Sequence, residues 1–518
     1  MKRFGVPVGA STLLAVGVLL AAFAGRSRLP VAPPPAPSHA TRAGLDASFP
    51  DDIRNLIYSW DPDDRRPASE RTRLLRDFIY ETFESSAWIP QSLFEHNVVV
   101  QAVVGDVDTI VREKVGLVLW PENALIKAYG MAPGFAPEGV PPQPLKWTVN
   151  CVLCHTAEID GRAYFGAGTK VFDEKVLGDA LKLLTHPSRR LTAGWHSTDD
   201  RLTGLAHDIL TRHHHDKIDA LTRGRSTAFA ASHVELYMRP HGGRMPAEAE
   251  VGRGDVKVPP LWHTAAKLPA GRWYVDGSFH GSFPLMASSM ELEKDRSFDT
   301  LEALVLPKIK EEFATIVRHL RPPPYPYAID GELAARGRSL FYSADVGCSR
   351  CHGVYDGTGG VIWPARHLDV GTDRSRLDVV SPGFIAAFDG SPIAAEGRLA
   401  RSEGYAATPL TGVWANYPYL HNGSVPTLHH LLGPISERPL IFEVKAARHF
   451  DQERVGQRLF IDPAAARSTE AVRLSRFGDD RDWFNALRQG GGNGGHDVWG
   501  QIRTDARRRA IIEYLKTL

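Results

Sequence analysis

Four cysteines occur in the 518-residue chain, and all of them fall in two copies of one five-residue pattern. The copies are Cys151-Val152-Leu153-Cys154-His155 and Cys348-Ser349-Arg350-Cys351-His352. In a Cys-x-x-Cys-His sequence, each thiol can form a thioether with a haem vinyl group while the adjacent histidine ligates the iron. The two motifs therefore predict two covalently bound haem c groups, with His155 and His352 as the proximal iron ligands.

A structural zinc site built from both halves of the chain is the alternative use of these cysteines. Structural zinc sites usually pair a Cys-x-x-Cys sequence with a second ligand pair rather than with an immediately following histidine. The sequence therefore favours haem over zinc.

The sixth iron ligand decides whether a haem only carries electrons or also binds a reactant. Methionine is the usual sixth ligand in cytochromes c, but all six methionines precede Cys348 in the chain. A histidine is therefore expected on the second haem, and the candidates after His352 are His367, His421, His429, His430, His449 and His496.

No sixth ligand stands out for the first haem. Met286 and Met290 are candidates, with packing in the core as their alternative role. We expect an open distal face that binds dioxygen or peroxide, bordered by residues 262–283. A peroxidase needs an acid–base group over the iron. Glu291 and Glu293 stand at a suitable distance in sequence, but they also read as part of an ordinary solvated charge run.

The elements that must hold these motifs are mostly helical. Helical spacing of apolar residues over 71–83, 329–341 and 504–518 predicts three amphipathic helices. One helix before the second motif and a terminal helix that crosses it are typical of cytochrome c. We predict a mainly α protein of two cytochrome c-type haem domains with long irregular loops and an N-terminal extension.

The domain boundaries follow from composition. The segments are 1–40, a signal peptide or N-terminal anchor with a Pro-rich linker; 41–145, the N-terminal extension, which is expected to wrap the first haem domain; 146–322, the first haem domain; and 328–518, the second. A Pro-rich stretch at 322–326 is the expected linker between the haem domains.

The N-terminus predicts export. Lys2 and Arg3 precede an uncharged apolar run, and Ala22-Phe23-Ala24 fits a signal cleavage site. The protein is expected in the periplasm or secreted, with an uncleaved membrane anchor as the alternative. The balance of 61 Lys and Arg against 60 Asp and Glu gives no reason to expect a nucleic-acid partner.

Residues 336–518 resemble the dihaem cytochrome c peroxidase superfamily, and within it the secreted dihaem rubber oxygenases. The motifs that carry the resemblance are Leu410-Thr411-Gly412-Val413-Trp414-Ala415-Asn416-Tyr417-Pro418-Tyr419-Leu420-His421-Asn422-Gly423-Ser424-Val425-Pro426-Thr427-Leu428, Glu437-Arg438-Pro439, Gly492-Asn493-Gly494-Gly495-His496 and Ile512-Glu513-Tyr514-Leu515-Lys516. The first half matches more weakly, through Val258-Pro259-Pro260-Leu261-Trp262 and Trp273-Tyr274-Val275-Asp276-Gly277.

The resemblance implies roles for particular residues. His496 would be the distal ligand of the second haem, with His421 as the alternative. Trp262 would relay electrons between the haems, with Trp273 as the alternative, and Phe279 would form a wall of the distal pocket. Packing in the core is the other reading of these aromatic residues.

The implied reaction is oxidative cleavage of an unsaturated hydrophobic substrate by dioxygen activated at the first haem, with the second haem transferring or storing electrons. One alternative is a peroxidase that reduces hydrogen peroxide with electrons from a small donor protein. The other is a non-catalytic electron carrier. The run His213-His214-His215 is interpreted as a polar surface segment, because consecutive side chains point in different directions and cannot easily share one metal ion.

Overall fold

The computed structural model describes residues 56–81, 89–90, 111–116, 118, 146–147, 151–185, 220, 222–227, 252–282, 313–357, 360–391, 394–395, 397–469 and 481–518. All of them belong to one unit of the chain, Thr41–Leu518, and Met1–Ala40 form a separate unit. Among the described residues, no helix is both long enough and apolar enough to span a membrane. The predicted signal or anchor lies outside the described residues. The boundaries at 146–322 and 328–518 remain predictions.

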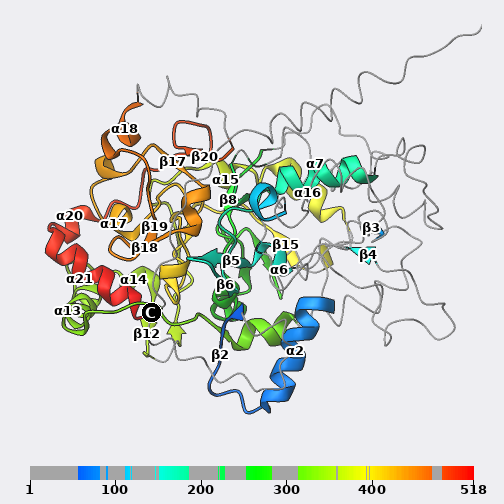
Figure 1. The fold of residues 1–518 in the computed structure, drawn as a ribbon, viewed down its shortest axis with the longest axis horizontal. Coiled ribbons are helices and arrows are strands. Elements are labelled where there is room, and N and C mark those ends of the chain that lie inside the picture. Colours follow the sequence, from blue (N-terminus) through cyan, green and yellow to red (C-terminus); the bar gives the residue numbers. More distant parts are fainter. Residues whose placement is uncertain are drawn as a thin grey trace, which may run out of the picture. The chain divides into compact units, whose positions relative to one another are not determined.

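The described helices are mostly short (Figure 1). Three of them confirm the helices expected from the apolar spacing: α2, α13 and α21. The α-helices are α2 (Ala68–Glu81), α6 (Cys151–Cys154), α7 (Glu174–Thr185), α10 (Thr264–Lys267), α13 (Gly331–Tyr342), α14 (Ser349–His352), α15 (Ser375–Asp378), α16 (Pro382–Asp389), α17 (Leu428–Leu431), α18 (Pro463–Arg467), α20 (Trp499–Ile502) and α21 (Asp505–Lys516).

Small sheets connect distant parts of the chain. Two have three strands, in the orders β1-β6-β5 and β15-β10-β9, and the remaining pairs are β11-β2, β12-β13, β14-β16, β17-β20, β18-β19, β3-β4 and β7-β8. The strands are β1 (Leu56–Ile57), β2 (Ser59–Trp60), β3 (Ile89–Pro90), β4 (Lys146–Trp147), β5 (Thr156–Ile159), β6 (Arg162–Phe165), β7 (Arg225–Ser226), β8 (Val256–Lys257), β9 (Arg272–Trp273), β10 (Phe279–Gly281), β11 (Leu320–Arg321), β12 (Val354–Tyr355), β13 (Val361–Ile362), β14 (His367–Leu368), β15 (Gly397–Leu399), β16 (Tyr405–Ala406), β17 (Ile441–Glu443), β18 (Phe450–Asp451), β19 (Gly456–Gln457) and β20 (Trp483–Asn485).

The expectation of a mainly α protein is wrong. Of the described residues, 37% are helical and 16% lie in strands. Most of these strands have only two or three residues. A strand is recognised in sequence by alternation over at least four residues, so strands this short leave no signal. The chain therefore combines a few helices with many short pairings between loops.

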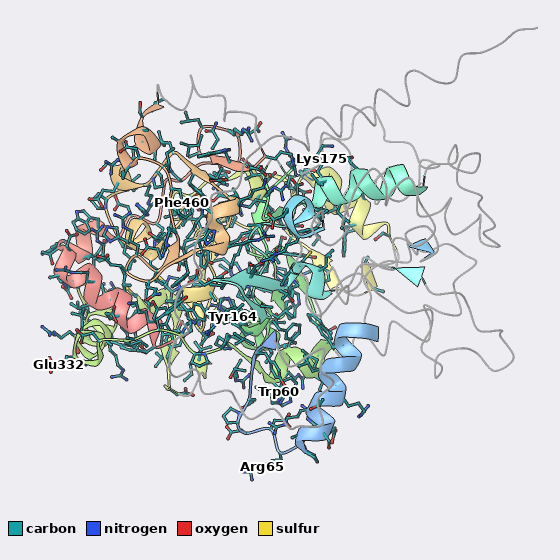
Figure 2. The ribbon with its side chains drawn as sticks, in the orientation of Figure 1. Trp60, Arg65, Tyr164, Lys175, Glu332 and Phe460 are labelled. Carbon is teal, nitrogen blue, oxygen red and sulfur yellow. The ribbon has the colours of Figure 1, made fainter. Side chains whose placement is uncertain are left out.

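Helices α13 and α21 pack against each other beside the second haem motif (Figure 1). A Cβ added at Gly337 of α13 would lie 1.8 Å from the carbonyl oxygen of Ala510 on α21, so only glycine permits this approach. Phe341 and Tyr514 meet edge to face near the crossing, with ring centroids 5.2 Å apart. Glu332 is exposed at the outer edge of α13 (Figure 2). The expected crossing of the two helices is confirmed.

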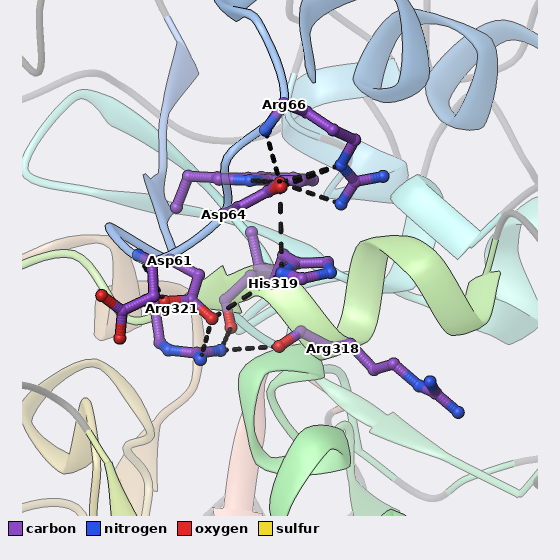
Figure 3. A network of polar contacts seen from close by, with 9 residues as sticks. Asp61, Asp64, Arg66, Arg318, His319 and Arg321 are labelled. Carbon is purple, nitrogen blue, oxygen red and sulfur yellow. Dashed lines mark hydrogen bonds and ion pairs between the residues drawn. The ribbon is translucent and has the colours of Figure 1, made fainter. Parts of the chain in front are cut away.

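The described part of the N-terminal extension packs on the first haem segment. Strand β1 pairs in parallel with β6, and β2 pairs with β11. Figure 3 shows the polar network beside β2, in which Arg321 forms an ion pair with Asp61 at 2.5 Å and Arg66 pairs with Asp64 at 2.9 Å. His319 lies between these pairs and stacks on the Trp60 ring. The extension is therefore joined to the segment that precedes the Pro-rich stretch.

The largest core draws on both predicted haem domains. Trp414 meets the rings of Tyr164, Tyr325 and Phe450 edge to face, with centroids 5.5 to 5.9 Å apart. Its indole N–H also donates to the Pro323 carbonyl at 3.1 Å. Edge-to-face aromatic pairs stabilise a core beyond their burial alone, by about 0.5–1.5 kcal/mol each. This core fixes the first haem segment and the family motif of the second half against each other.

Candidate functional site: two histidine motifs and the segment between them

The first motif forms a single helical turn, α6, which brings its two cysteine positions one turn apart. The side chain of Cys151 lies outside the described residues. A loop closes over the motif, since the Gly166 amide donates to the His155 carbonyl at 2.8 Å and the Thr169 amide donates to the Cys154 carbonyl at 2.7 Å. These bonds hold the end of the motif in place.

His155 is kept neutral by its surroundings. Its Nδ1 atom is buried, although the residue as a whole is partly exposed. Burial lowers the pKa of His155 to about 4, and the backbone carbonyl of Pro259 opposes the shift. A neutral imidazole is the form that coordinates a metal ion. His155 therefore fits the role of a proximal ligand.

The second motif also ends in a fixed histidine. The Nδ1 atom of His352 donates to the Thr408 carbonyl at 2.9 Å, which leaves Nε2 as the atom available to a metal ion. The Tyr355 hydroxyl donates to the His352 carbonyl at 2.7 Å and accepts from the Leu410 amide at 2.8 Å. Burial lowers the pKa of His352. Both the protonation state and the orientation of this ring suit an iron ligand.

The two proximal histidines share one local arrangement. Pro259 precedes Pro260-Leu261, and Thr408 precedes Pro409-Leu410. The His352 Nδ1 atom donates to the Thr408 carbonyl, whereas the buried Nδ1 atom of His155 has no hydrogen-bond partner among the described residues, and the Pro259 carbonyl affects His155 only by raising its pKa. Proline restricts the preceding residue to extended conformations, which fixes the direction of that carbonyl. The sequence alone did not predict that a carbonyl before a Pro-Leu pair faces each histidine, although the repeated Pro-Leu pair is visible in the sequence.

His496 lies across from His352. The two ring centroids are 6.1 Å apart, with the ring planes at 70°. A histidine nitrogen binds a metal ion at about 2 Å, so two imidazoles on opposite sides of one ion have centroids about 6 Å apart. Burial lowers the pKa of His496 to about 4, so this ring is also neutral. The pair therefore fits a single haem iron between its rings.

Arg438 holds the loop that carries His496. Its guanidinium is buried and donates to the carbonyls of Asn493 at 2.6 Å, Gly495 at 2.8 Å and His496 at 3.3 Å. The His496 amide donates to the Val370 carbonyl at 2.8 Å. The sequence analysis placed Arg438 in a family motif without a role. Its contacts make it a positioning residue for His496.

His421 has a different environment. Its ring stacks on Tyr405 with centroids 3.8 Å apart, and its carbonyl accepts from the Lys257 amide at 2.9 Å. Burial lowers the pKa of His421 to about 3. Of the two candidates for the distal ligand of the second haem, the geometry favours His496.

Trp262 lies between the two haem segments. Its indole N–H donates to the Thr411 carbonyl at 3.1 Å, and His263 Nε2 donates to the same oxygen at 2.9 Å. A Cβ added at Gly166 or at Gly412 would lie 2.9 Å from the indole, so a glycine from each predicted domain makes room for this ring. The position is the one that an electron relay between the two motifs would need.

Trp273 and Phe279 are neighbours on paired strands β9 and β10. The Trp273 indole donates to the Gly281 carbonyl at 2.7 Å, and Phe279 meets Phe388 edge to face at 5.9 Å. Both side chains belong to one hydrophobic cluster with residues of α16. These contacts are those of a core. A role for either residue at the first haem stays a prediction.

Several predicted residues lie outside the described part of the chain. They are Met286, Met290, Glu291, Glu293 and the run 213–215. Among the side chains that the structure describes, no three His, Cys, Asp or Glu residues gather as ligands of one metal ion.

Residues 404–443 match the family described as RoxA-like, cytochrome c-like. This short match supports a c-type cytochrome at a coarse level. The match includes Thr408, Trp414 and Arg438, and it implies haem c as the cofactor. It bears out the resemblance to the rubber oxygenases at this coarse level, and it does not extend to the wider peroxidase superfamily.

Two curated relatives come from Sinorhizobium fredii. The uncharacterized protein y4iM is 34% identical over 249 residues, which cover 39% of this chain and 52% of y4iM. The uncharacterized protein y4iJ is 34% identical over 122 residues, which cover 22% of this chain and 18% of y4iJ. The chain thus spans about half the length of the first relative and less of the second.

Proposed function

We propose that the protein is a c-type cytochrome oxidoreductase with two covalently bound haems that have different tasks. The haem on Cys348 and Cys351, with His352 and His496 as axial ligands, stores and transfers electrons. The haem on Cys151 and Cys154, with His155 as its one protein ligand, binds dioxygen. A haem with an open axial position supplies dioxygen activation, and one with both positions filled supplies one-electron transfer.

The observation that carries the proposal is the separation of 6.1 Å between the His352 and His496 rings. Histidines on both faces lead to a low-spin iron with no position for a reactant. Dioxygen would then bind and react at the first haem. The match at residues 404–443 supports a RoxA-like cytochrome. Dioxygen as the reactant and an unsaturated hydrophobic compound as the substrate are proposed from the resemblance to the rubber oxygenases.

A short path through the chain supports electron transfer between the motifs. His155 interacts with the Pro259 carbonyl, three residues before Trp262. Trp262 donates to the Thr411 carbonyl, three residues after Thr408, which accepts from His352. The path therefore crosses between the two segments at one hydrogen bond.

Spectra of the purified protein test the proposal. Absorption and EPR spectra recorded before and after cyanide, air and peroxide should show one low-spin haem that ignores added ligands and one haem that binds cyanide. A spectrum of an oxygenated first haem that persists in air would support the oxygenase. Two low-spin haems that ignore every ligand would leave only the electron carrier, and rapid peroxide turnover with a reduced donor would identify a peroxidase.

Two variants, His496→Ala and His421→Ala, test which histidine is the distal ligand of the low-spin haem. His496→Ala should convert the second haem to a ligand-binding form and leave the first unchanged, whereas His421→Ala should leave both spectra as in the wild type. If His421→Ala changes the spectrum of the second haem and His496→Ala does not, the distal ligand is His421.

Export is part of the proposal, because the first 40 residues have the pattern of a secretory signal. Mass spectrometry of the mature N-terminus, together with the mass of the covalently bound haem, would test both export and the number of haems. An uncleaved N-terminus in a membrane fraction would favour the anchor.

A further inference from the structure

Three cationic side chains meet beside the first haem segment without an ion pair to a described carboxylate. Lys170 and Arg225 are buried, and Lys257 is partly buried. Arg225 and Lys257 are directly opposite each other in the pairing of β7 with β8. Like charges opposite each other in a sheet are destabilising, so this cluster costs the fold stability unless an anion joins it.

Most hydrogen-bond acceptors of these cations are backbone carbonyls of the family motif, and Arg225 also donates to the Gly224 carbonyl. The Lys170 ammonium donates to the Ala415 carbonyl, and the Lys257 ammonium donates to the Asn416 carbonyl. Arg225 donates to the carbonyls of Asn422 and, at 2.7 Å, Gly423. Carbonyls satisfy hydrogen bonds but bring no negative charge. The cations thus approach the motif from three different segments of the chain.

Electrostatics agrees with the geometry. Burial, together with the nearby Arg225, lowers the pKa of Lys170 to about 7. Burial also lowers the pKa of Lys257, with Lys170 and Arg225 adding to the shift. Among the described carboxylates, Asp255 opposes the shift of Arg225. The balance of charge at the cluster remains positive.

The two lysines retain capacity to donate. An ammonium has three N–H bonds, and each of these lysines has one acceptor among the described residues. The ammonium of Lys170 also lies 4.8 Å from the centre of the Tyr417 ring, and that of Lys257 lies 5.6 Å from the centre of the Tyr419 ring. The remaining N–H bonds are available to a carboxylate, which offers about four acceptor sites. Lys257 is the one member of the cluster that is partly exposed.

Both lysines are connected to the first haem motif. Lys170 follows Thr169, whose amide donates to the Cys154 carbonyl at 2.7 Å. Lys257 stands two residues before Pro259, whose carbonyl interacts with His155. A haem carries two propionate groups, which are carboxylates attached to the edge of the macrocycle.

We propose that Lys170, Arg225 and Lys257 bind a propionate carboxylate of the haem attached to Cys151 and Cys154. This inference rests on the haem attachment assumed in the proposed function. It adds a carboxylate-binding site that joins the haem edge to residues 415–423. The cations neutralise the carboxylate, and the carboxylate relieves the repulsion between them.

The test is the reduction potential of the first haem in the intact protein, followed by absorption. Lys257→Met keeps the length of the side chain and removes its charge, which leaves the propionate charge less neutralised and favours ferric iron. The equilibrium constant for reduction should fall about tenfold, which is 59 mV for a one-electron couple. Lys257→Arg should restore the wild-type value. Lys175→Met is the matched control, because Lys175 pairs with Asp179 on the partly exposed surface of α7 (Figure 2).

A measurement on the wild type covers the case in which Lys257→Met does not fold. Infrared difference spectra with 13C-labelled propionates should show an ionised carboxylate on the first haem at pH 5. A propionate that is protonated at pH 5, or a potential unchanged in Lys257→Met, would overturn the inference. So would a potential that responds to added phosphate or chloride in a saturable manner, because a free anion would then occupy the cluster.

Failure of the proposed function has a different signature. If mass spectrometry finds no haem on Cys151 and Cys154, the proposed function fails, and this inference fails with it. If the haem is present and the potential and the carboxylate are insensitive to the cluster, only this inference fails.

Discussion

Replacement of Arg438 tests whether the loop at 493–496 is held in place for His496. Arg438→Met keeps an unbranched chain of similar reach and removes all N–H donors and the charge. The affected acceptors are the carbonyls of Asn493, Gly495 and His496, together with two in α17 and its end. The proximal side of the second haem is left unchanged.

The magnitude follows from the two shortest bonds, at 2.6 and 2.8 Å. A hydrogen bond to a charged group contributes about 1.5–3 kcal/mol. Hydration of the freed carbonyls and relief from burying a guanidinium offset part of that loss, so we expect loop opening to become easier by about 2–4 kcal/mol. At about 1.4 kcal/mol per factor of ten, the opening equilibrium rises by a factor of about 30 to 1,000.

Opening of the loop withdraws His496 from the iron, so the readout is the spin state of the second haem. EPR and absorption of ferric Arg438→Met should show a mixture of low-spin and high-spin iron at this haem. The matched control is Arg507→Met, because Arg507 pairs with Asp345, whose side chain is 55% exposed, and such a pair contributes little.

The reasoning is refuted if Arg438→Met keeps a fully low-spin second haem. An unchanged spin state together with a lower unfolding midpoint would make Arg438 a general stabilising residue rather than one that positions His496. A wild-type midpoint with a wild-type spectrum would show that the guanidinium is dispensable.

Three further predictions concern the relay, the helix crossing and acid stability. Trp262→Phe should slow electron transfer between the haems, because it removes the indole and its hydrogen bond to the Thr411 carbonyl. Trp273→Phe is the comparison, and flash-photolysis rates that fall only in the latter would assign the relay to Trp273. Gly337→Ala should lower the free energy of unfolding by about 1–3 kcal/mol through overpacking, and with it the thermal unfolding midpoint. Gly331→Ala should leave the midpoint unchanged, because an added Cβ there meets nothing within 4 Å. Burial acts to raise the pKa of Asp64, but hydrogen bonds from neighbouring side chains outweigh it and lower this pKa well below the ordinary 3.8. The stabilisation from ionised Asp64 is therefore fully present above the ordinary pKa of 3.8, and it is lost as the pH falls from there through the depressed pKa of the folded state. Urea unfolding of Asp64→Asn should show a deficit relative to the wild type at pH 7 that shrinks below pH 4, and a deficit independent of pH would contradict the assignment.

The sequence predicted the elements whose signals are local. Apolar residues at helical spacing identified α2, α13 and α21, because each of these helices buries one face against a core. The two Cys-x-x-Cys-His motifs are contiguous, so their chemistry could be predicted without any knowledge of the fold. His496 could be chosen only through a resemblance, since the chain brings it to His352 across 144 positions.

The rest depends on contacts that no local pattern records. The fold class was wrong because the short strands arise where loops meet, as in the parallel pairing of β1 with β6. Arg225 and Lys257 become neighbours only when β7 pairs with β8, and neither residue differs in sequence from an ordinary surface cation. Arg438 was visible in a motif, but its five carbonyl acceptors come from helix α17 and from the separate loop at 493–496.

The arrangement around the two proximal histidines explains how similar motifs can perform different tasks. Each ring is buried and has a lowered pKa, and each has a carbonyl before a Pro-Leu pair that opposes the shift, although only His352 makes a hydrogen bond to that carbonyl. A difference in function must then arise from the other face of each haem and from the charges nearby. Arg438 directs His496 towards the second site, and the cations of β7 and β8 stand with Lys170 beside the first. Filled axial positions and local charge both tune the potential of a haem iron. In the proposed function, these two features would therefore give the two haems unequal potentials and would direct electron flow through Trp262.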